Sequence, residues 1–450
     1  MMGEMKKHPI YRKADMLLHA FVLSGFALLD NGEKKEVEQA SVSMELFRDP
    51  DAAEQILLAD GSYALRARLL PAQLTGIPRT LPVRAVTFGR IYDGRDDQYP
   101  QRHRIEGVIA DRGLPFRDLE TLWKRVGLEA FGIESETVLA AAGKDLYRIV
   151  VRKPSPEGGE RELTLGTIGA GTWIARALLG QEAPDVSVWV FSIDVDALAM
   201  EDYGIASRKD LYSPLAPYLE QSDCSCPSYG TDFSSRARNV LRRRGYLEFI
   251  GERVYTADAY VRMNMIQEAW DTNNAGLTLV KPLPNYHNPL TPLETRDGLP
   301  TVLAPSLEQA MSENFAAGVP SVRLFEIGHI FKPGRGGGEP WEKLSLSIGA
   351  YRKDLTLNEF LGEVSAVLRE LGVSNHFFIP TDMAIAYDQR QCRVILDEKM
   401  KYLDGNCGHI SPVALKNFRI DTEAFMAQFE LDTIEQKSAE EYAFVPYELR

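Results

Sequence analysis

Apolar residues recur at helical spacing close to the start of the chain. The repeat runs from His8 to Gly25, and its apolar positions are Leu17, Leu18, Phe21 and Val22. Side chains three and four residues apart share one face of a helix. Because glycine commonly ends a helix, Gly25 marks the expected end. The pattern therefore predicts an amphipathic helix.

A second helical pattern begins after the middle of the chain. It starts at Ser234, ends at Gly245 and is followed by a strand-like segment, residues 247–254. Its arginines are Arg236, Arg238, Arg242, Arg243 and Arg244. We interpret them as a solvated helix face, and the alternative is a contact with nucleic acid.

The stretch between the two patterns indicates how the chain is divided. Residues 211–230 are rich in Pro, Ser and Tyr, as linkers are. We expect one module at residues 1–220, a linker at residues 221–231 and a second module at residues 232–450.

Composition and charge narrow the class of protein. A chain of 450 residues has room for two to three domains, and 44% hydrophobic with 26% charged residues is typical of soluble globular proteins. We find no apolar run of the ~18 residues that cross a bilayer, and the first residues lack the apolar core of a signal peptide. We therefore expect a cytoplasmic protein without membrane contact. Four cysteines do not make a disulfide framework. The net charge of −13 disfavours, without excluding, binding to tRNA or other RNA.

Two neighbouring segments carry a family resemblance. Gly89-Arg90-Ile91-Tyr92 is followed eleven residues later by His103-Arg104-Ile105-Glu106-Gly107. This layout resembles the second signature motif of class II aminoacyl-tRNA synthetases, in the form used by the catalytic α subunit of phenylalanyl-tRNA synthetase. In that family two antiparallel strands and their loop hold ATP and the amino acid. The resemblance implies such a hairpin here.

Other segments of the first module fit the same family. The segment from His8-Pro9-Ile10 is similar to the first motif, a helix at the dimer interface. Residues 65–73 resemble a segment that carries side chains to the substrate amino acid, and residues 191–205 resemble the third motif. The resemblance implies a homodimer, with residues 8–25 near an interface.

The second module resembles the noncatalytic, synthetase-like core of the β subunit. Its matching segments are residues 288–291, residues 303–307 with Asn314, residues 324–331 and residues 408–412. The implied fold is an α/β (α+β) protein with two tandem antiparallel, class II synthetase-like sheets flanked by helices. No segment resembles the family's tRNA-clasping coiled coil, editing domain or anticodon-binding domain, so we do not expect charging of tRNAPhe.

The positions that hold ATP in the family are changed. Its two main ATP-binding arginines correspond to Asp93 and Ala197, and the residue that reads adenine corresponds to Arg95. Losing one cation at the α-phosphate costs a factor of ~10²–10³ in rate. An active chain, an ATP- and Mg²⁺-dependent ligase that activates an amino acid, would need another phosphate ligand. The shortened loop offers Arg95 or Arg102 for that role.

The family's amino-acid site is changed as well. Its histidine and one glutamine correspond to Arg68 and Arg104, whereas Gln73 and Glu106 are kept. Two guanidiniums suit an anionic ligand such as a carboxylate or phosphate. Alternatively, Arg68 and Arg104 pair with Glu106 or Asp93 and only satisfy buried charges.

Two further patterns indicate neither a metal site nor a nucleotide-binding loop. Cys224-x-Cys226 and Cys407-x-His409 offer zinc ligands, but Cys-x-Cys is shorter than the usual ligand spacing, so we expect no metal site. The glycine-rich residues 334–338 lack the Lys-Ser/Thr of a phosphate loop and predict a hairpin turn.

Three functions remain open from the sequence. They are a divergent adenylate-forming enzyme, a synthetase paralogue that binds a small anionic or amino-acid-like ligand without activating it, and an RNA-binding accessory protein. The changed ATP positions favour the second.

Overall fold

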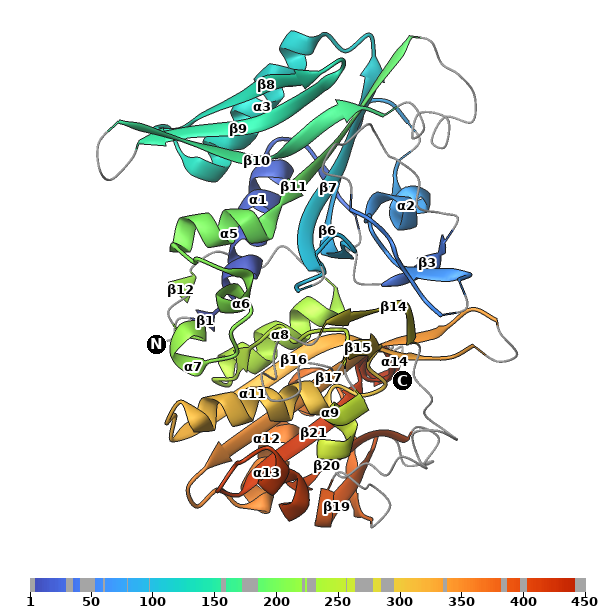
Figure 1. Ribbon diagram of the computed structural model, residues 1–450, viewed down its shortest axis with the longest axis vertical. Helices are drawn as coiled ribbons and strands as arrows, with labels where there is room; N and C mark the ends of the chain where they lie inside the picture. The colour runs from blue at the N-terminus through green and yellow to red at the C-terminus, as the bar shows by residue number, and fades with distance from the viewer. Residues whose placement is uncertain are drawn as a thin grey trace, which may run out of the picture. The chain divides into compact units, whose positions relative to one another are not determined.

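The computed structural model forms two compact units, each with its own central sheet (Figure 1). It describes residues 5–29, 35–40, 53–59, 61–78, 80–96, 98–154, 159–171, 185–220, 223–224, 232–255, 257–263, 278–284, 295–334, 338–381, 387–396 and 403–441. We call Pro9–Leu211 the N-terminal unit. The C-terminal unit comprises most residues from Tyr212 onward together with Met1–His8.

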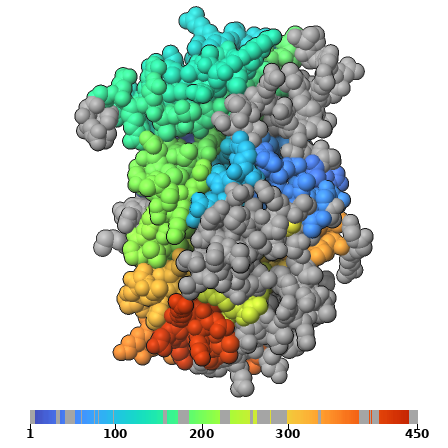
Figure 2. Space-filling model, in the orientation of Figure 1, coloured from blue at the N-terminus to red at the C-terminus, as the bar shows by residue number. Residues whose placement is uncertain are grey.

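The N-terminal unit is built on a seven-stranded sheet. In spatial order its strands are β2 (Ala27–Leu28), β6 (Val83–Tyr92), β7 (Gln101–Arg112), β11 (Val186–Asp194), β10 (Glu160–Ala170), β9 (Leu146–Pro154) and β8 (Glu136–Gly143). All neighbours are antiparallel except β2, which pairs with β6 in parallel. The edge strand β8 is exposed along most of its length (Figure 2).

The smaller elements of the N-terminal unit complete its two faces. Its helices are α1 (Pro9–Leu23), α2 (Leu70–Gln73), a 3-10 turn (Leu74–Gly76), α3 (Phe116–Phe131), α5 (Val195–Tyr203) and α6 (Arg208–Leu211). A second sheet has the order β3 (Val37–Gln39), β5 (Tyr63–Leu65), β4 (Ile56–Leu57).

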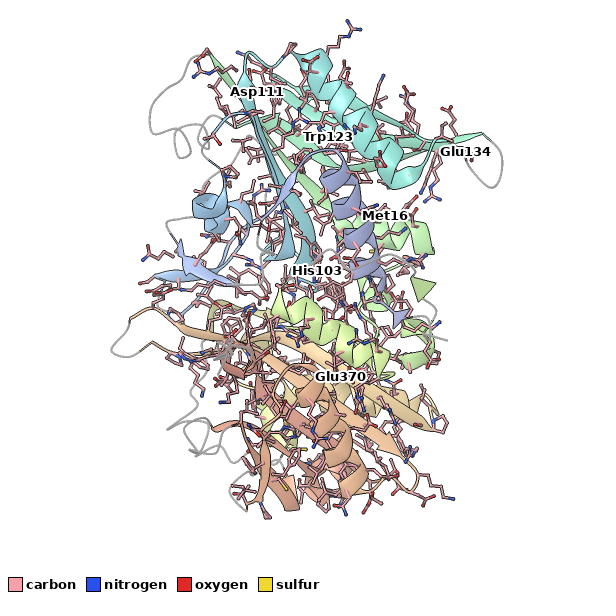
Figure 3. The ribbon with its side chains drawn as sticks, turned by 180° about the vertical axis from the view of Figure 1, so that it is seen from behind. Met16, His103, Asp111, Trp123, Glu134 and Glu370 are labelled. Atoms are coloured by element: carbon pink, nitrogen blue, oxygen red, sulfur yellow. The ribbon has the colours of Figure 1, made fainter. Side chains whose placement is uncertain are left out.

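Successive side chains of each strand alternate between the two faces of the sheet. One face is covered by α1 and α3, and we call it the helix face; the opposite face carries Arg104, and we call it the site face. Phe191 of β11 stacks on Phe21 of α1 at 5.2 Å and meets Trp123 of α3 edge-on at 5.1 Å. Met16 marks α1 and Trp123 marks α3 on this side (Figure 3). Because successive side chains of a strand point to opposite faces, Ser192 faces the other side, where Arg104 donates a hydrogen bond to it.

The C-terminal unit repeats this topology. Its seven-stranded sheet has the order β13 (Leu247–Glu248), β16 (Ser321–Lys332), β17 (Trp341–Arg352), β21 (Ala424–Glu430), β20 (Leu403–Ile410), β19 (Tyr387–Ile395), β18 (Phe377–Pro380). Again the first pair is parallel and the rest antiparallel. The sequence-based expectation of two tandem antiparallel sheets flanked by helices is therefore confirmed.

The other elements of the C-terminal unit are short strands and helices. They are β1 (Met5–Lys6) with β12 (Asp223–Cys224), β14 (Thr278–Pro284) with β15 (Thr295–Gly298), α7 (Ala216–Leu219), α8 (Phe233–Arg243), α9 (Ala257–Arg262), α11 (Ala304–Ala316), α12 (Leu357–Glu370), α13 (Pro412–Asn417) and α14 (Leu431–Glu441). In its core, α8 and α12 pack on one face of the sheet through Val240, Leu241, Phe360 and Val364. The opposite face packs against α11 through Leu307 and Met311.

Both helices predicted from periodicity form. α1 and α8 end just before Gly25 and Gly245, whose φ angles of 87° and 80° lie in the left-handed region that glycine tolerates best. At the other end of α8, Asp232 accepts a hydrogen bond from Ser235 N at 3.3 Å. Within the described residues, no helix has the length and apolar character needed to cross a bilayer.

Two local predictions are wrong. The strand expected over residues 247–254 is only Leu247–Glu248, because the chain then leaves the sheet and Gly251 N donates to Glu326 Oε1 at 3.0 Å. The arginines of α8 are not all solvated. Arg238 and Arg242 are buried and pair with Glu248 at 2.8 and 2.5 Å.

One contact anchors the start of α11 to the sheet. Gln428 Oε1 on β21 accepts hydrogen bonds from Leu303 N and Ala304 N, both at 3.1 Å. The first N–H groups of a helix have no partner within the helix, and both residues are buried. Gln428 therefore supplies the acceptor that α11 needs at its buried end.

We expect Gln428→Leu to lower the free energy of unfolding by about 2 kcal/mol or more, because it leaves two buried N–H groups unsatisfied. Urea unfolding followed by circular dichroism measures this. The matched control is Gln436→Leu, on the exposed side of α14, which should change the free energy by less than about 0.5 kcal/mol. Equal effects of the two variants would contradict the anchoring role.

Candidate functional site

The β6–β7 hairpin places three of the predicted site residues on one face. Arg102, Arg104 and Glu106 are separated by two positions along β7, and their partners on β6 are Ile91, Gly89 and Thr87. A period of two puts them on the same side of the sheet. The hairpin expected from the sequence thus brings these residues together.

Glu106 is the buried acceptor of this face. Its Oε2 accepts hydrogen bonds from Leu69 N at 2.9 Å and Leu70 N at 3.0 Å, which fixes the start of α2. Its Oε1 lies 3.6 Å from Arg68 Nη1, and both side chains are at most 5% exposed. The internal pairing that the sequence left open is therefore present for Arg68.

Arg104 has a different environment. It is 8% exposed, and its Nη1 donates to Ser192 Oγ at 3.1 Å. Its Nε is buried without a hydrogen-bond partner. Within the described part of the chain Arg104 forms no ion pair. The internal pairing considered for Arg104 is thus not observed.

Gln73 lies at the end of α2 and is also buried. Glu106 fixes the start of this four-residue helix, so Gln73 is held within one helical turn of the Glu106 carboxylate. A half-buried carboxyl, Glu38, lies nearby on β3 and accepts a hydrogen bond from Gln55 Nε2 at 3.1 Å. Burial raises the pKa of Glu38. Sequence reasoning missed Glu38.

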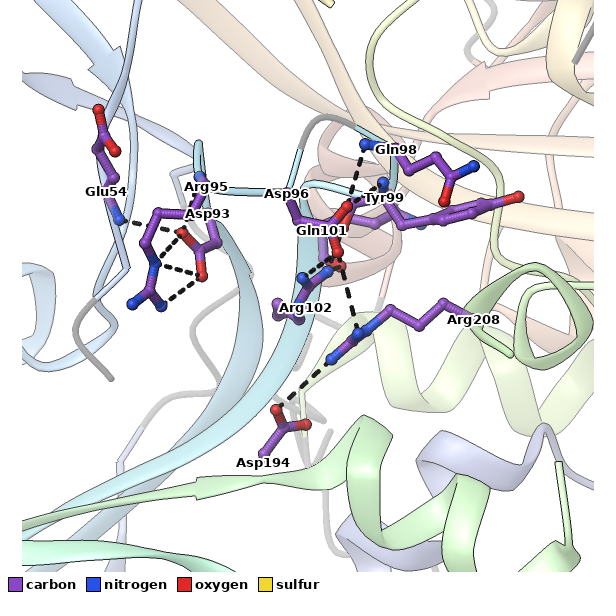
Figure 4. Close-up of polar contacts among 10 residues, drawn as sticks. All are labelled: Glu54, Asp93, Arg95, Asp96, Gln98, Tyr99, Gln101, Arg102, Asp194 and Arg208. Atoms are coloured by element: carbon purple, nitrogen blue, oxygen red, sulfur yellow. Dashed lines mark hydrogen bonds and ion pairs between the residues drawn. The ribbon is translucent and has the colours of Figure 1, made fainter. Parts of the chain in front are cut away.

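The two arginines considered for the ATP phosphate are both held by aspartates (Figure 4). Arg95 Nε lies 2.9 Å from Asp93 Oδ1, and its Nη2 lies 2.7 Å from Asp93 Oδ2. Arg102 Nη2 lies 2.6 Å from Asp96 Oδ2. Each of these guanidiniums has a carboxylate beside it, so a ligand bound to either one would also lie close to an aspartate.

These hydrogen bonds set the ionisation of both aspartates. Burial alone would raise the pKa of Asp93, but hydrogen bonds from Arg95 and from backbone N–H groups outweigh it and lower the pKa. The pKa of Asp96 is lowered in the same way, with burial opposed by hydrogen bonds from Tyr99 N and Arg102. Both carboxylates are therefore charged at neutral pH.

A third arginine shares this arrangement. Arg208 of α6 lies 3.9 Å from Asp96 and 3.9 Å from Asp194 (Figure 4). Asp194 also accepts from Ala197 N at 2.9 Å and so caps α5. Arg208, Asp96 and Asp194 were missed from the sequence, because no local spacing links Asp96 to residues about a hundred positions away.

The described residues show no group suited to a metal ion. Among them, no cluster of three or more His, Cys, Asp and Glu side chains could hold one. Cys407 is buried on β20 opposite Cys392 of β19. Cys226 lies outside the described residues, so the Cys224-x-Cys226 pair is not placed.

Comparison with known proteins finds similarity to both subunits of one enzyme, phenylalanyl-tRNA synthetase. A family model described as the phenylalanyl tRNA synthetase beta chain CLM domain matches residues 227–431. Among curated proteins, the phenylalanine–tRNA ligase alpha subunit of Caldanaerobacter subterraneus subsp. tengcongensis is 26% identical over 243 residues, 48% of this chain and 68% of that protein. The corresponding subunit of Heliobacterium modesticaldum is 26% identical over 241 residues, with the same coverage.

A solved structure is also similar. It is Desulfitobacterium hafniense PylSc, a pyrrolysyl tRNA synthetase, with a TM-score of 0.35, 14% identity, and coverage of 45% of this chain and 66% of that one. The sequence matches pair an alpha-subunit likeness with a beta-chain likeness, in a chain whose two units repeat one sheet topology. The chain is therefore similar to both subunits of phenylalanyl-tRNA synthetase.

Proposed function

We propose that this chain is a synthetase paralogue that binds a small carboxylate-bearing ligand at Arg104 and does not charge tRNAPhe. The observation that carries the proposal is the ion-pair pattern of the hairpin. Its other buried arginines, Arg90 and Arg102, pair with Glu36 at 3.2 Å and Asp96 at 2.6 Å. Arg104 forms no such pair with the described residues.

A carboxylate ligand would complete this arrangement. Burying a charge without a counter-charge is costly, and buried cations are normally paired. Arg104 Nη1 donates a hydrogen bond to Ser192 Oγ, whereas Arg104 Nε is buried and has no hydrogen-bond partner. A guanidinium binds a carboxylate through two parallel hydrogen bonds, which gives orientation as well as affinity.

The alternative, activation of a ligand with ATP, fits the described residues poorly. Class II synthetases use ATP and Mg²⁺, and cations must offset charge at the α-phosphate. Arg95, Arg102 and Arg208 each lie within 4 Å of an aspartate. A phosphate would have to displace these carboxylates, and a carboxylate repels it. We therefore derive no step through ATP.

The family's homodimer is proposed here as well. The end of α1 exposes Val22 by 39% and Leu23 by 44%, and Ile133, just beyond α3, is 89% exposed. α3 packs against α1, and Arg125 of α3 donates to Leu23 O at 2.6 Å. Val22 and Leu23 are adjacent in the chain, and we propose that this exposed apolar end of α1 lies in the interface.

We expect no ATP–pyrophosphate exchange above background with pooled amino acids, because the arginines of the loop are neutralised by aspartates. Arg95→Ala and Arg102→Ala should leave that background unchanged. Radiolabelled pyrophosphate measures the exchange. Exchange that disappears in either variant would instead identify a divergent adenylate-forming enzyme with a relocated phosphate ligand.

We expect small carboxylates to raise the melting temperature of the wild-type protein and to have no such effect on Arg104→Met. Differential scanning fluorimetry with 3-phenylpropanoate, 4-methylpentanoate and butanoate tests this. The matched control is Arg112→Met, on the same strand but exposed and paired with Asp185, which should keep the shift. A shift that survives in Arg104→Met would place the ligand elsewhere.

We expect the wild-type chain of 50.4 kDa to sediment as a dimer. Leu23→Glu should sediment as a monomer, because a charge at an apolar interface is desolvated without a partner. Analytical ultracentrifugation distinguishes the two. Leu57→Glu is the control, since Leu57 is an exposed leucine of β4, at 38%. A wild-type monomer would refute the dimer proposal.

A further inference from the structure

An acidic side chain is buried in the C-terminal unit. Glu308 of α11 is fully buried, and neither of its carboxyl oxygens has a hydrogen-bond partner among the residues that the structure describes. Most buried polar side-chain atoms in proteins have such a partner, and burying a charged carboxylate without one is costly. Glu308 therefore keeps its proton under conditions in which an exposed glutamate has lost it.

The part of α11 that carries Glu308 packs into an apolar core. Leu307 and Met311 belong to one buried hydrophobic cluster with Leu324 of β16. Burial in such surroundings disfavours the charged form of a carboxyl group. It raises the pKa of Glu308 to about 8, and the positive charge of Arg262 acts in the opposite direction.

Arg262 is the one charged side chain, among the described residues, that acts on the ionisation of Glu308. The tyrosines of the elements around α11 stay neutral near pH 8, since burial raises the pKa of Tyr260 on α9 and of Tyr351 on β17 to about 12. The other charged side chains of these elements have partners or are exposed: Glu326 pairs with Arg253 at 2.6 Å, Glu313 accepts from Gln309 at 2.9 Å, and Lys416 of α13 is exposed.

Arg262, the last residue of α9, connects three segments. Its Nη1 donates to Oε1 of Gln309, the neighbour of Glu308 on α11, at 3.0 Å. Its Nη2 donates to Asn417 O at 3.5 Å, and its guanidinium carbon lies 4.1 Å from the ring centroid of Phe418. Asn417 Nδ2 in turn donates to Arg262 O at 2.9 Å. Arg262 thus joins α9 to α11 and to the end of α13.

We propose that Glu308 and Arg262 form a proton-controlled clamp between α9, α11 and α13. While Glu308 holds its proton, Arg262 binds Gln309 and Asn417 and fastens α9 to α13. When Glu308 releases the proton to solvent, the buried carboxylate is stable only beside a cation. The guanidinium of Arg262 then leaves Asn417 O for the carboxylate, and the contact between α9 and α13 loosens. This device does not depend on the ligand site at Arg104.

Proton binding sets the direction of the pH effect. The pKa of an unperturbed glutamate is 4.5, whereas burial raises that of Glu308 to about 8. Between these values the folded state holds a proton that the unfolded state has lost, so stability falls as the pH rises and the loss is complete above about pH 8. Glu308→Gln has no such proton to lose. Its urea midpoint should therefore exceed that of the wild type above about pH 8 and approach it near about pH 5.

Infrared difference spectroscopy measures the proton directly, because a protonated carboxyl group has its own C=O stretching band. We expect a band that disappears with a midpoint near about pH 8 in the wild-type protein and is absent from Glu308→Gln. Arg262→Gln should move the midpoint upward by about one unit, since the arginine favours the carboxylate. Arg262→Lys should move it less. The matched control is Arg352→Gln, in an exposed pair with Glu359, which should leave the midpoint unchanged.

Hydrogen exchange followed by mass spectrometry tests the clamp. After correction for the intrinsic effect of pH, α9 and α13 of the wild-type protein should exchange at least about threefold faster at about pH 9 than at about pH 7. Glu308→Gln should show no such increase. The wild-type measurement stands by itself where a variant does not fold.

The outcomes decide the proposal. A band that titrates near pH 8 and is lost in Glu308→Gln, together with faster exchange in α9 and α13, supports it. If Glu308 is ionised throughout the range from about pH 6 to about pH 10, or protonated throughout it, the proposal is overturned. If the band titrates but exchange in α9 and α13 does not change, or the midpoint is the same in Arg262→Gln, Arg262 does not move to Glu308 and the clamp is overturned.

Discussion

The site depends on one constraint, which is that charges placed on the buried face of a sheet must be compensated. Glu106 is fully buried on β7. An isolated buried carboxylate would be strongly destabilising, and three groups compensate this one: the N–H groups of Leu69 and Leu70 and the guanidinium of Arg68. Because the same carboxylate also fixes the start of α2, the charge balance and the backbone geometry of the site are coupled. Removing Glu106 would release both.

The two units meet this constraint with different residues at equivalent positions. The row Thr87, Glu106, Ser192 across β6, β7 and β11 corresponds to Glu326, Ser347, Gln428 across β16, β17 and β21. In the first row a carboxylate accepts from the start of α2, whereas in the second a neutral amide accepts from the start of α11. Glu326 is then free to pair with Arg253. In the N-terminal unit the carboxylate of this row lies on β7, and the guanidinium of Arg104 remains without it. In the C-terminal unit the carboxylate lies one strand away, on β16, and pairs with Arg253.

The family resemblance predicted the two tandem sheets, and local patterns in the sequence predicted two of the helices. Helical spacing and terminal glycines predicted α1 and α8, and the motif around Arg90 and Glu106 predicted the hairpin. The short β13 could not be predicted, because its end depends on a hydrogen bond from Gly251 to Glu326, 75 residues away. The buried state of Arg238 and Arg242 likewise depends on Glu248, which lies beyond the end of the helix.

The residues of the candidate site were predictable only in part. The family resemblance placed Arg68, Arg104 and Glu106 together, yet it could not decide which arginine the carboxylate would hold. That choice follows from chain path: Arg68 precedes the residues whose N–H groups bind Glu106, so it arrives beside the carboxylate with them. Arg104 shares a strand with Glu106, and its guanidinium reaches Ser192 on the neighbouring strand. Arg95, Arg102 and Arg208 are each matched by an aspartate, whereas no carboxylate of the described residues pairs with Arg104. Arg104 is only 8% exposed, and an uncompensated charge is costly when it is buried. A ligand that supplies the missing negative charge accounts for both facts.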